Sequence, residues 1–344
     1  MIKEVNRAVS SSPDNLSIFY EAGPFWQKAL DDIEREFLLN GIRNFRGSDL
    51  NLNFFVPTYG CPGNGFTATQ KENLIKKCSN LSKKQKAYVK NSLNGFNHAL
   101  SDYGTFYASN FKNDPFNLLS FSESKIGNPV EHFHFNNKNY SRSSLNYLLG
   151  LSFLQQQVPD FIPSRVLEIG GGFGTLGEIL TKCNIPDLKY IDLDLSPMFI
   201  IASEYAKKVF GEREIFETGT YTDEKLEIDE LCKLNFLPNW SIETLKGKID
   251  LFVNFISFQE MEPNIVGNYA SHVQRLEPEF LLLRNLREGK QKSIKGRLGV
   301  NQPILGDDYL EFFDQYKLKA SNTVPFGFQT VDGYNSEIML LEKK

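Results

Sequence analysis

Four glycines within five residues separate an apolar run from a helical pattern in the middle of this chain. The run, Arg165–Ile169, has the composition of a buried parallel strand. The residues without a side chain are Gly170, Gly171, Gly172 and Gly174. Glycine takes positive φ easily and lets a ligand approach the backbone closely. From Thr175 the apolar residues recur at helical spacing, so the turn lies at a helix N-terminus, where free N–H groups favour polar or anionic ligand groups. The stretch predicts a strand, a tight turn and a helix start.

Two nucleotide chemistries fit such a turn. The first is dinucleotide binding, because Gly172–Gly177 satisfies G-x-G-x-x-G and Asp192 follows twenty residues after Gly172. In that fold, however, the strand runs directly into the first glycine, and here Gly170 and Gly171 intervene. This mismatch weakens the dinucleotide interpretation.

The second chemistry is binding of S-adenosylmethionine. Glu168-x-Gly170-x-Gly172-x-Gly174 follows the E/D-x-G-x-G-x-G turn of class I methyltransferases. The acid at the strand end can bind the amino group of the methionine moiety. The glycines have no side chains, so the chain of that moiety can lie close to their backbone. We favour this interpretation over dinucleotide binding, and both over a glycine-rich turn without a ligand.

Composition narrows the class of protein. Hydrophobic residues make up 41% of the 344 and charged residues 23%, as in an ordinary globular protein. The net charge of −4 and the absence of a basic block argue against a nucleic-acid partner. The four cysteines show no C-x-x-C spacing, which fits a reducing compartment and argues against a zinc cage. Without a signal-peptide pattern or a stretch of ~20 apolar residues, we expect a cytoplasmic protein with no membrane span.

The length predicts two parts, with the boundary in the polar segment near Ser122. Residues 1–121 are expected to be a mainly helical region for acceptor recognition or homo-oligomerisation. It contains a helix from Pro24 to Gly41, a loop-rich stretch over 54–66 and a long helical region over 82–111. Residues 122–344 are expected to form the cofactor-binding domain.

Strand and helix patterns alternate after residue 140, as an α/β sheet covered on both faces requires. Strands are expected at 165–169, 188–193, 214–218, 249–256, 280–283, 317–324 and 338–341, with 284–289 as a loop. Helices are expected at 197–211, 265–273 and 309–313, and a further helix is expected to run from a cap at Ser141 or Ser144 to about Gln157. The last two strands match the antiparallel hairpin that finishes a class I methyltransferase sheet, which a dinucleotide domain would not need.

At this point the chain resembles a bacterial family of sugar O-methyltransferases. The segments that carry the resemblance are Ile126–Pro129, Leu145–Tyr147, Val166–Gly174, Asn254–Met261 and Arg284–Gly289. The resemblance implies a class I fold, S-adenosylmethionine as cofactor and methyl transfer to a sugar hydroxyl of a surface glycan or its precursor. The acceptor would be a sugar nucleotide, a lipid-linked sugar or an oligosaccharide.

Candidate cofactor residues follow from the turn and the strand ends. They are Glu168, Gly170, Gly172, Gly174, Asp194, Asp192 and Asn254. Asp194, before Leu-Ser-Pro, is the first choice for the carboxylate that accepts from the ribose hydroxyls, and Asp192 is the second. Capping of the helix at Pro197 is the alternative role of Asp194.

Methyl transfer to a hydroxyl also requires a general base, because the hydroxyl is too weak an acid to attack with its proton in place. The candidates are His134, His132 and Glu260. On an extended segment the side chains of both histidines would face the same side. We expect His134 to be the base, with Glu260 orienting its side chain or binding the sugar. Gln259 and Arg284 are expected to bind substrate. No acid cluster at ligand spacing predicts a metal.

Two other functions remain open from the sequence. One is methylation of a different small molecule, such as a glycosylated natural product. The other is a non-catalytic nucleotide-binding protein on the same fold.

Overall fold

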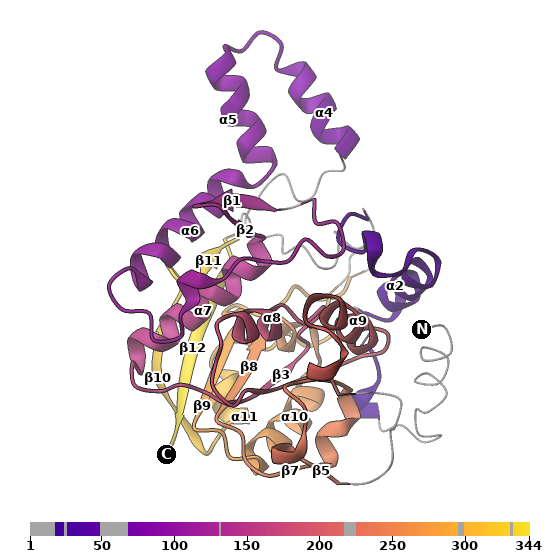
Figure 1. Ribbon diagram of the computed structural model, residues 1–344, viewed down its shortest axis with the longest axis vertical. Coiled ribbons are helices and arrows are strands. Elements are labelled where there is room, and N and C mark those ends of the chain that lie inside the picture. The colour runs from indigo at the N-terminus through magenta and orange to yellow at the C-terminus, as the bar shows by residue number, and fades with distance from the viewer. Residues whose placement is uncertain are drawn as a thin grey trace.

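The computed structural model describes residues 18–23, 26–48, 68–130, 132–216, 225–294, 299–330 and 333–344 (Figure 1). The expected helix start at Pro24, the loop-rich stretch 54–66 and part of the expected strand 214–218 lie outside these residues.

A mixed sheet forms the centre of the molecule (Figure 1). Its strands lie in the order β6 (Leu234–Pro238), β4 (Lys189–Asp194), β3 (Arg165–Ile169), β8 (Leu251–Phe255), β9 (Phe280–Leu286), β12 (Asn335–Lys343) and β10 (Tyr316–Asn322), with the short β11 (Phe328–Gln329) beside β12. The strands from β6 to β9 are parallel, and β12 runs antiparallel to both β9 and β10. The expected α/β fold of a class I methyltransferase, with its antiparallel C-terminal hairpin, is confirmed.

Helices cover both faces of the sheet, because alternate residues of each buried strand point to opposite sides. On one side Val166, Val253 and Leu282 share a core with α7 (Arg142–Gln157), α8 (Thr175–Lys182) and α9 (Met198–Phe210). On the other side the neighbouring Leu167, Phe252 and Leu281 share a core with α10 (Pro263–Arg275) and α11 (Asp308–Phe312). As expected, Ser141 caps α7, in a capping box with Ser144.

The N-terminal region packs on this sheet. It contains η1 (Ile18–Tyr20), α2 (Gln27–Asn40), η2 (Gly41–Asn44), α4 (Ala68–Lys77), α5 (Lys83–Leu93), α6 (Phe96–Asn110) and η4 (Leu118–Ser120), followed by the hairpin of β1 (Phe133–Phe135) and β2 (Lys138–Tyr140). Ile33 of α2 and Phe106 of α6 belong to the same core as Val166. Position 121/122 therefore does not separate two cores. Among the residues that the structure describes, only α4 and α5 project from the body (Figure 1).

Two expectations about elements were wrong. The third sheet strand is β6 rather than 214–218, where Ile215 makes only an isolated bridge to Leu234. Its short sequence, which ends in Pro238, has no alternating pattern to mark it. Strand β9 continues through Arg284 to Leu286, so the first three residues of the expected loop 284–289 belong to the strand. The expected helical region 82–111 is present as the two helices α5 and α6, which are separated at Gly95, whose φ is 76°.

The remaining elements are short. They are η5 (Glu212–Glu214), β5 (Leu226–Glu227), η6 (Ile228–Glu230), η7 (Asn239–Glu243), β7 (Leu245–Lys246) and η8 (Phe258–Glu260). Among the described residues, no helix combines the length and the apolar character that a membrane crossing requires.

Candidate functional site

A cavity of about 570 Å³ lies at the carboxyl ends of β3, β4 and β8. This is the edge at which open α/β sheets bind ligands. The glycine turn 170–172 and Asp194 form one part of its wall, and residues 255–257 and 259–261 form another. Phe19, Glu21 and Trp26 from the N-terminal region line it too. The N-terminal region therefore helps to build the cavity, through residues that the sequence analysis did not single out.

The glycine turn is pressed against the ends of its neighbouring strands. Gly170, Gly172 and Gly174 have φ values of 76°, 67° and 85°, in the region that favours glycine. A Cβ at Gly170 would collide with the Ser257 side chain, and one at Gly171 would lie 2.7 Å from the Asp192 carboxylate. The missing side chains thus serve close packing of the turn as well as access of a ligand to its backbone.

Two aspartates of β4 accept hydrogen bonds from the backbone of this turn. Gly171 N–H donates to Asp192 at 3.0 Å, and Gly172 N–H donates to Asp194 at 2.9 Å. Asp194 lines the cavity, whereas Asp192 is fully buried and does not. Burial raises the pKa of Asp194 to about 7 and that of Asp192 well above its ordinary value. Of the two, only Asp194 lies on the cavity wall.

Glu168 lies one layer deeper than expected. It is fully buried beside Asp192 in the β3–β4 register, and its carboxylate accepts from the hydroxyls of Tyr147, at 2.7 Å, and Tyr190. Burial, together with the charge of Asp194, raises its pKa to about 7 although the two hydroxyls act against the shift. Tyr147 lies on the cavity wall and Glu168 does not.

Asn254 forms hydrogen bonds that fix the end of β8, and it does not line the cavity. Its amide donates to the Ile169 carbonyl at 3.0 Å and to Ser257 Oγ at 2.6 Å, while its oxygen accepts from Phe258 N–H at 3.1 Å. These bonds fix the turn that follows β8. In this turn Ile256, which lines the cavity, has φ of 76°. A β-branched residue in this region is strained by roughly 1–3 kcal/mol, and such strain is concentrated at functional sites.

Glu260 is on the cavity wall, held from two sides. Its carboxylate accepts from Lys290 Nζ at 2.6 Å and from the indole N–H of Trp26 at 3.0 Å. Gln259 also lines the cavity, with its side-chain oxygen accepting from Leu286 N–H at 2.8 Å. Arg284 does not line it: the side chain is buried, donates to the Phe326 carbonyl and lies 5.3 Å from the ring centroid of Phe255.

The structure brings neither candidate histidine to the cavity. His134 is exposed on β1, while Nε2 of His132 lies 3.5 Å from the Glu123 carboxylate. The extended strand begins only at Phe133, so the two side chains do not share a face. The expectation that they face the same side was wrong.

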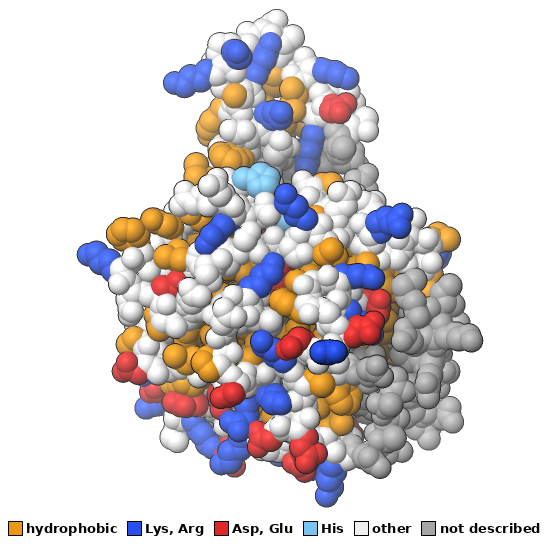
Figure 2. All heavy atoms as spheres, in the orientation of Figure 1, with side chains coloured by type: hydrophobic (Ala, Val, Ile, Leu, Met, Phe, Trp, Pro, Cys, Tyr) orange, Lys and Arg blue, Asp and Glu red, His pale blue; other side chains and the backbone are white. Residues whose placement is uncertain are grey.

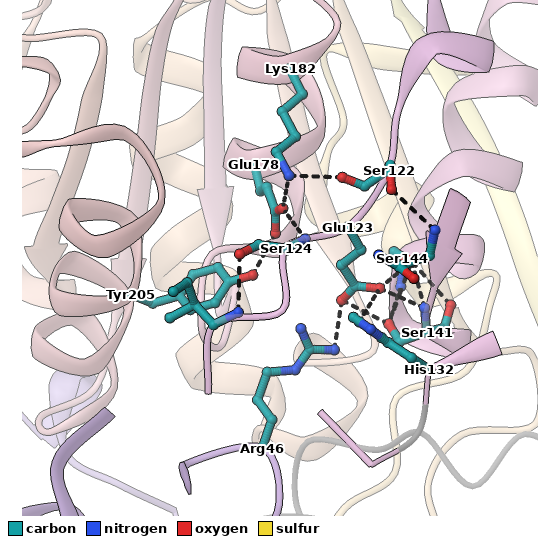
Figure 3. A network of polar contacts seen from close by, with 12 residues as sticks. Arg46, Ser122, Glu123, Ser124, His132, Ser141, Ser144, Glu178, Lys182 and Tyr205 are labelled. Carbon is teal, nitrogen blue, oxygen red and sulfur yellow. Dashed lines mark hydrogen bonds and ion pairs between the residues drawn. The ribbon is translucent and has the colours of Figure 1, made fainter. Parts of the chain in front are cut away.

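His132 belongs instead to a buried polar cluster around Glu123 (Figure 3). Arg46 donates to Glu123 at 2.6 Å, Ser144 at 2.8 Å and Ser141 Oγ at 3.0 Å. Burial alone would raise the pKa of Glu123, but Arg46, His132 and Ser144 outweigh it and hold the pKa well below the ordinary range. The Arg46 guanidinium also lies 4.7 Å from the ring centroid of Phe173 in the glycine turn. The cluster links η2 to the glycine turn.

Asn239 is a wall residue that the sequence did not reveal. It directly follows β6, the strand that the sequence misplaced. Its amide nitrogen donates to the Tyr20 carbonyl at 3.0 Å and to the Tyr269 hydroxyl at 2.9 Å. Its side-chain oxygen is buried without a partner, a free acceptor in a residue that lines the cavity. Across the described ranges, His, Cys, Asp and Glu form no group of three that could hold a metal.

No protein-family model and no curated protein matches this sequence. Among solved structures, the chain is similar to magnesium protoporphyrin IX methyltransferase from Synechocystis with bound SAM, at 15% identity and a TM-score of 0.39, over 59% of this chain and 81% of that one. It is similar to the mitomycin 7-O-methyltransferase at 11% identity and a TM-score of 0.37, over 98% of this chain and 73% of that one. A third similar structure is 1,6-didemethyltoxoflavin-N1-methyltransferase from Burkholderia thailandensis, at 14% identity and a TM-score of 0.38, over 57% of this chain and 76% of that one.

Proposed function

We propose that this protein is an S-adenosylmethionine-dependent O-methyltransferase that acts on a sugar hydroxyl. The observation that carries the proposal is the cavity at the carboxyl ends of β3, β4 and β8, whose wall combines the backbone of the glycine turn with the Asp194 carboxylate. The cofactor supplies an electrophilic methyl group on a sulfonium.

The residues of the wall fit the parts of this cofactor. The Asp194 carboxylate is placed to accept from the ribose hydroxyls, and the unpartnered oxygen of Asn239 suits the exocyclic amine of an adenine ring. The backbone at Gly170–Gly172 leaves room for the methionine chain. Tyr147 presents its ring at the wall, while its hydroxyl donates to Glu168 behind it. Glu168 would then act on the cofactor through Tyr147.

Glu260 is the carboxylate that we assign to the acceptor. In the in-line step, a carbon–oxygen bond forms at the methyl, the carbon–sulfur bond breaks, and the hydroxyl proton passes to a base. Glu260 lies on the wall after β8, where Trp26 and Lys290 fix its orientation. Because neither His132 nor His134 lines the cavity, we propose Glu260 as the base.

The character of the remaining wall favours a sugar. Both aromatic and polar side chains line it; aromatic faces stack on sugar rings, and polar groups bind hydroxyls. These aromatic residues are Phe19, Trp26, Phe328 and Tyr334, and the polar ones include Glu21, Gln259 and Thr330. The resemblance to sugar O-methyltransferases points the same way.

Calorimetry followed by an acceptor screen tests the proposal. We expect S-adenosylhomocysteine to bind and NAD not to bind; binding of NAD alone would exclude a methyltransferase. Cofactor turnover is then measured against sugar nucleotides, lipid-linked sugars, short oligosaccharides and glycosylated natural products. Turnover with a sugar that stops when its free hydroxyl is blocked supports the proposal. Turnover only on non-sugar hydroxyls would show that the acceptor is another kind of small molecule and not a sugar.

A further inference from the structure

The projecting α4–α5 hairpin carries a charge that the body of the protein does not share. Residues 68–93 contain seven lysines and one acidic residue, Glu72. The hairpin therefore has a formal charge of +6, and the rest of the chain has −10 within the total of −4. Figure 2 shows basic side chains, which in residues 68–93 are all lysines, gathered over this projection. Along the sequence these lysines are spread over twenty residues, so no basic block is visible before the chain folds.

The lysines of the hairpin also differ from those of the body in their partners. The seven are Lys71, Lys76, Lys77, Lys83, Lys84, Lys86 and Lys90. In the described part of the chain none of them forms an ion pair, whereas Lys182, Lys207, Lys248, Lys290, Lys317 and Lys319 on the body each pair with a carboxylate. Five of the seven are exposed, and Lys71 and Lys86 are half-buried. The hairpin presents cations that the protein itself does not neutralise.

The chemistry of these residues favours a diffuse anionic surface over a specific phosphate site. Arginine is the residue that recognises phosphates by paired, planar hydrogen bonds, and residues 68–93 contain none. Lysine acts as a point charge, which is sufficient for the field above anionic lipid headgroups, where clusters of four to eight are typical. Tyr88 on α5 is 68% exposed, and tyrosine favours the boundary between headgroups and water.

We propose that the α4–α5 hairpin binds the protein peripherally to a bilayer that contains anionic phospholipid. The acidic remainder of the chain would be repelled by the same bilayer, so attraction is concentrated on the projection. This contact does not depend on the proposed methyl transfer. It does agree with it, since a lipid-linked sugar acceptor is found at such a surface.

Sedimentation of the full chain with vesicles tests the contact without any measurement of turnover. We use vesicles of phosphatidylcholine with about 30% phosphatidylglycerol, and vesicles of phosphatidylcholine alone, at about 0.1 M and about 0.5 M salt. We expect binding to the anionic vesicles at low salt and its loss at high salt, because the charges are exposed and screened. Absence of binding to anionic vesicles at low salt would overturn the proposal.

A pair of charge-matched variants locates the contact. The hairpin variant replaces Lys76, Lys77, Lys83 and Lys84 by Gln, and the control variant replaces Lys233, Lys248, Lys317 and Lys343 by Gln. Both variants lose four positive charges. A difference between their affinities for vesicles therefore shows where on the protein the lysines contact the bilayer. We expect the hairpin variant to lose at least about tenfold in vesicle affinity and the control to stay within about twofold. Equal losses would overturn the proposal, as would tighter binding of a DNA duplex than of anionic vesicles at the same salt.

Discussion

The indole N–H of Trp26 donates to the Glu260 carboxylate at 3.0 Å, across 234 positions of sequence. The other carboxylate oxygen accepts from Lys290. Trp26 comes from the segment that leads into α2, whereas Glu260 and Lys290 come from the sheet edge. The N-terminal region therefore takes part in positioning the proposed base.

Replacement of Glu260 by Gln tests its role. We expect turnover to fall by ~10²–10⁴-fold, the contribution of a general base, with the affinity for S-adenosylhomocysteine unchanged. His134→Ala should keep near-normal turnover, because this exposed side chain is not on the cavity wall. Turnover is measured with the acceptor found in the screen. An inactive His134→Ala variant beside an active Glu260→Gln variant would restore the histidine as base.

Replacement of Asp194 by Ala tests the ribose contact. We expect S-adenosylhomocysteine to bind more weakly by ~1.5–3 kcal/mol, as for hydrogen bonds to a charged group, measured by calorimetry. Asp192→Ala is the matched comparison, because Asp192 also holds the glycine turn but is not on the wall. A larger loss of affinity for Asp192→Ala than for Asp194→Ala would show that the assignment of the two is reversed.

Glu168 makes the stability depend on pH. Burial raises its pKa from 4.5 to about 7, so between these values the folded protein holds more protons than the unfolded chain. Its contribution is fully present below about pH 4.5 and is lost as pH rises through 7. We expect the unfolding free energy of the protein, relative to Glu168→Gln, to fall by about 2–3 kcal/mol between pH 4.5 and pH 8 in urea titrations. A difference that stays constant over this range would contradict the prediction.

Two helical glycines should respond to alanine with opposite signs. A Cβ at Gly150 of α7 would collide with the ring of Phe255, which is stacked on Tyr147 at 4.9 Å between centroids. We expect Gly150→Ala to destabilise the protein by ~1–3 kcal/mol through overpacking. At Gly104 of α6 a Cβ would meet nothing within 4 Å, so Gly104→Ala should stabilise by ~0.5–1 kcal/mol. Urea unfolding of both variants decides this, and the same sign for both would refute the explanation.

The parts of the fold that were predictable are those with a local signal. The glycine turn, the capping box at Ser141 and the stop at Gly41 each follow from residue types within a few positions, and the structure has all three elements there. The third sheet strand was missed because β6 is five residues long and includes Asn235, whose buried amide bonds to backbone carbonyls. These hydrogen bonds depend on the tertiary structure, so the local sequence does not predict them.

The candidate site was predictable only in part for the same reason. Asp194 ends β4 and Glu260 lies in the turn that follows β8, so their position at the sheet edge could be inferred. Glu168 and Asn254 also come from β3 and β8, but other residues of the protein occupy their polar atoms. Trp26 reaches the site from far away in sequence, and no local pattern encodes such a contact.

The position of β12 has a consequence for the order in which the protein can form. This strand is near the end of the sequence, yet it lies inside the sheet between β9 and β10. Its Ile338 and Leu340 share a core with Ile33 of α2. While a ribosome has not yet made β12, the edge of β9 and the core residues that pack against Ile338 and Leu340 stay open to water. The native core can therefore close only after β12 has left the ribosome, so α2, which is made long before β12, has to wait for it.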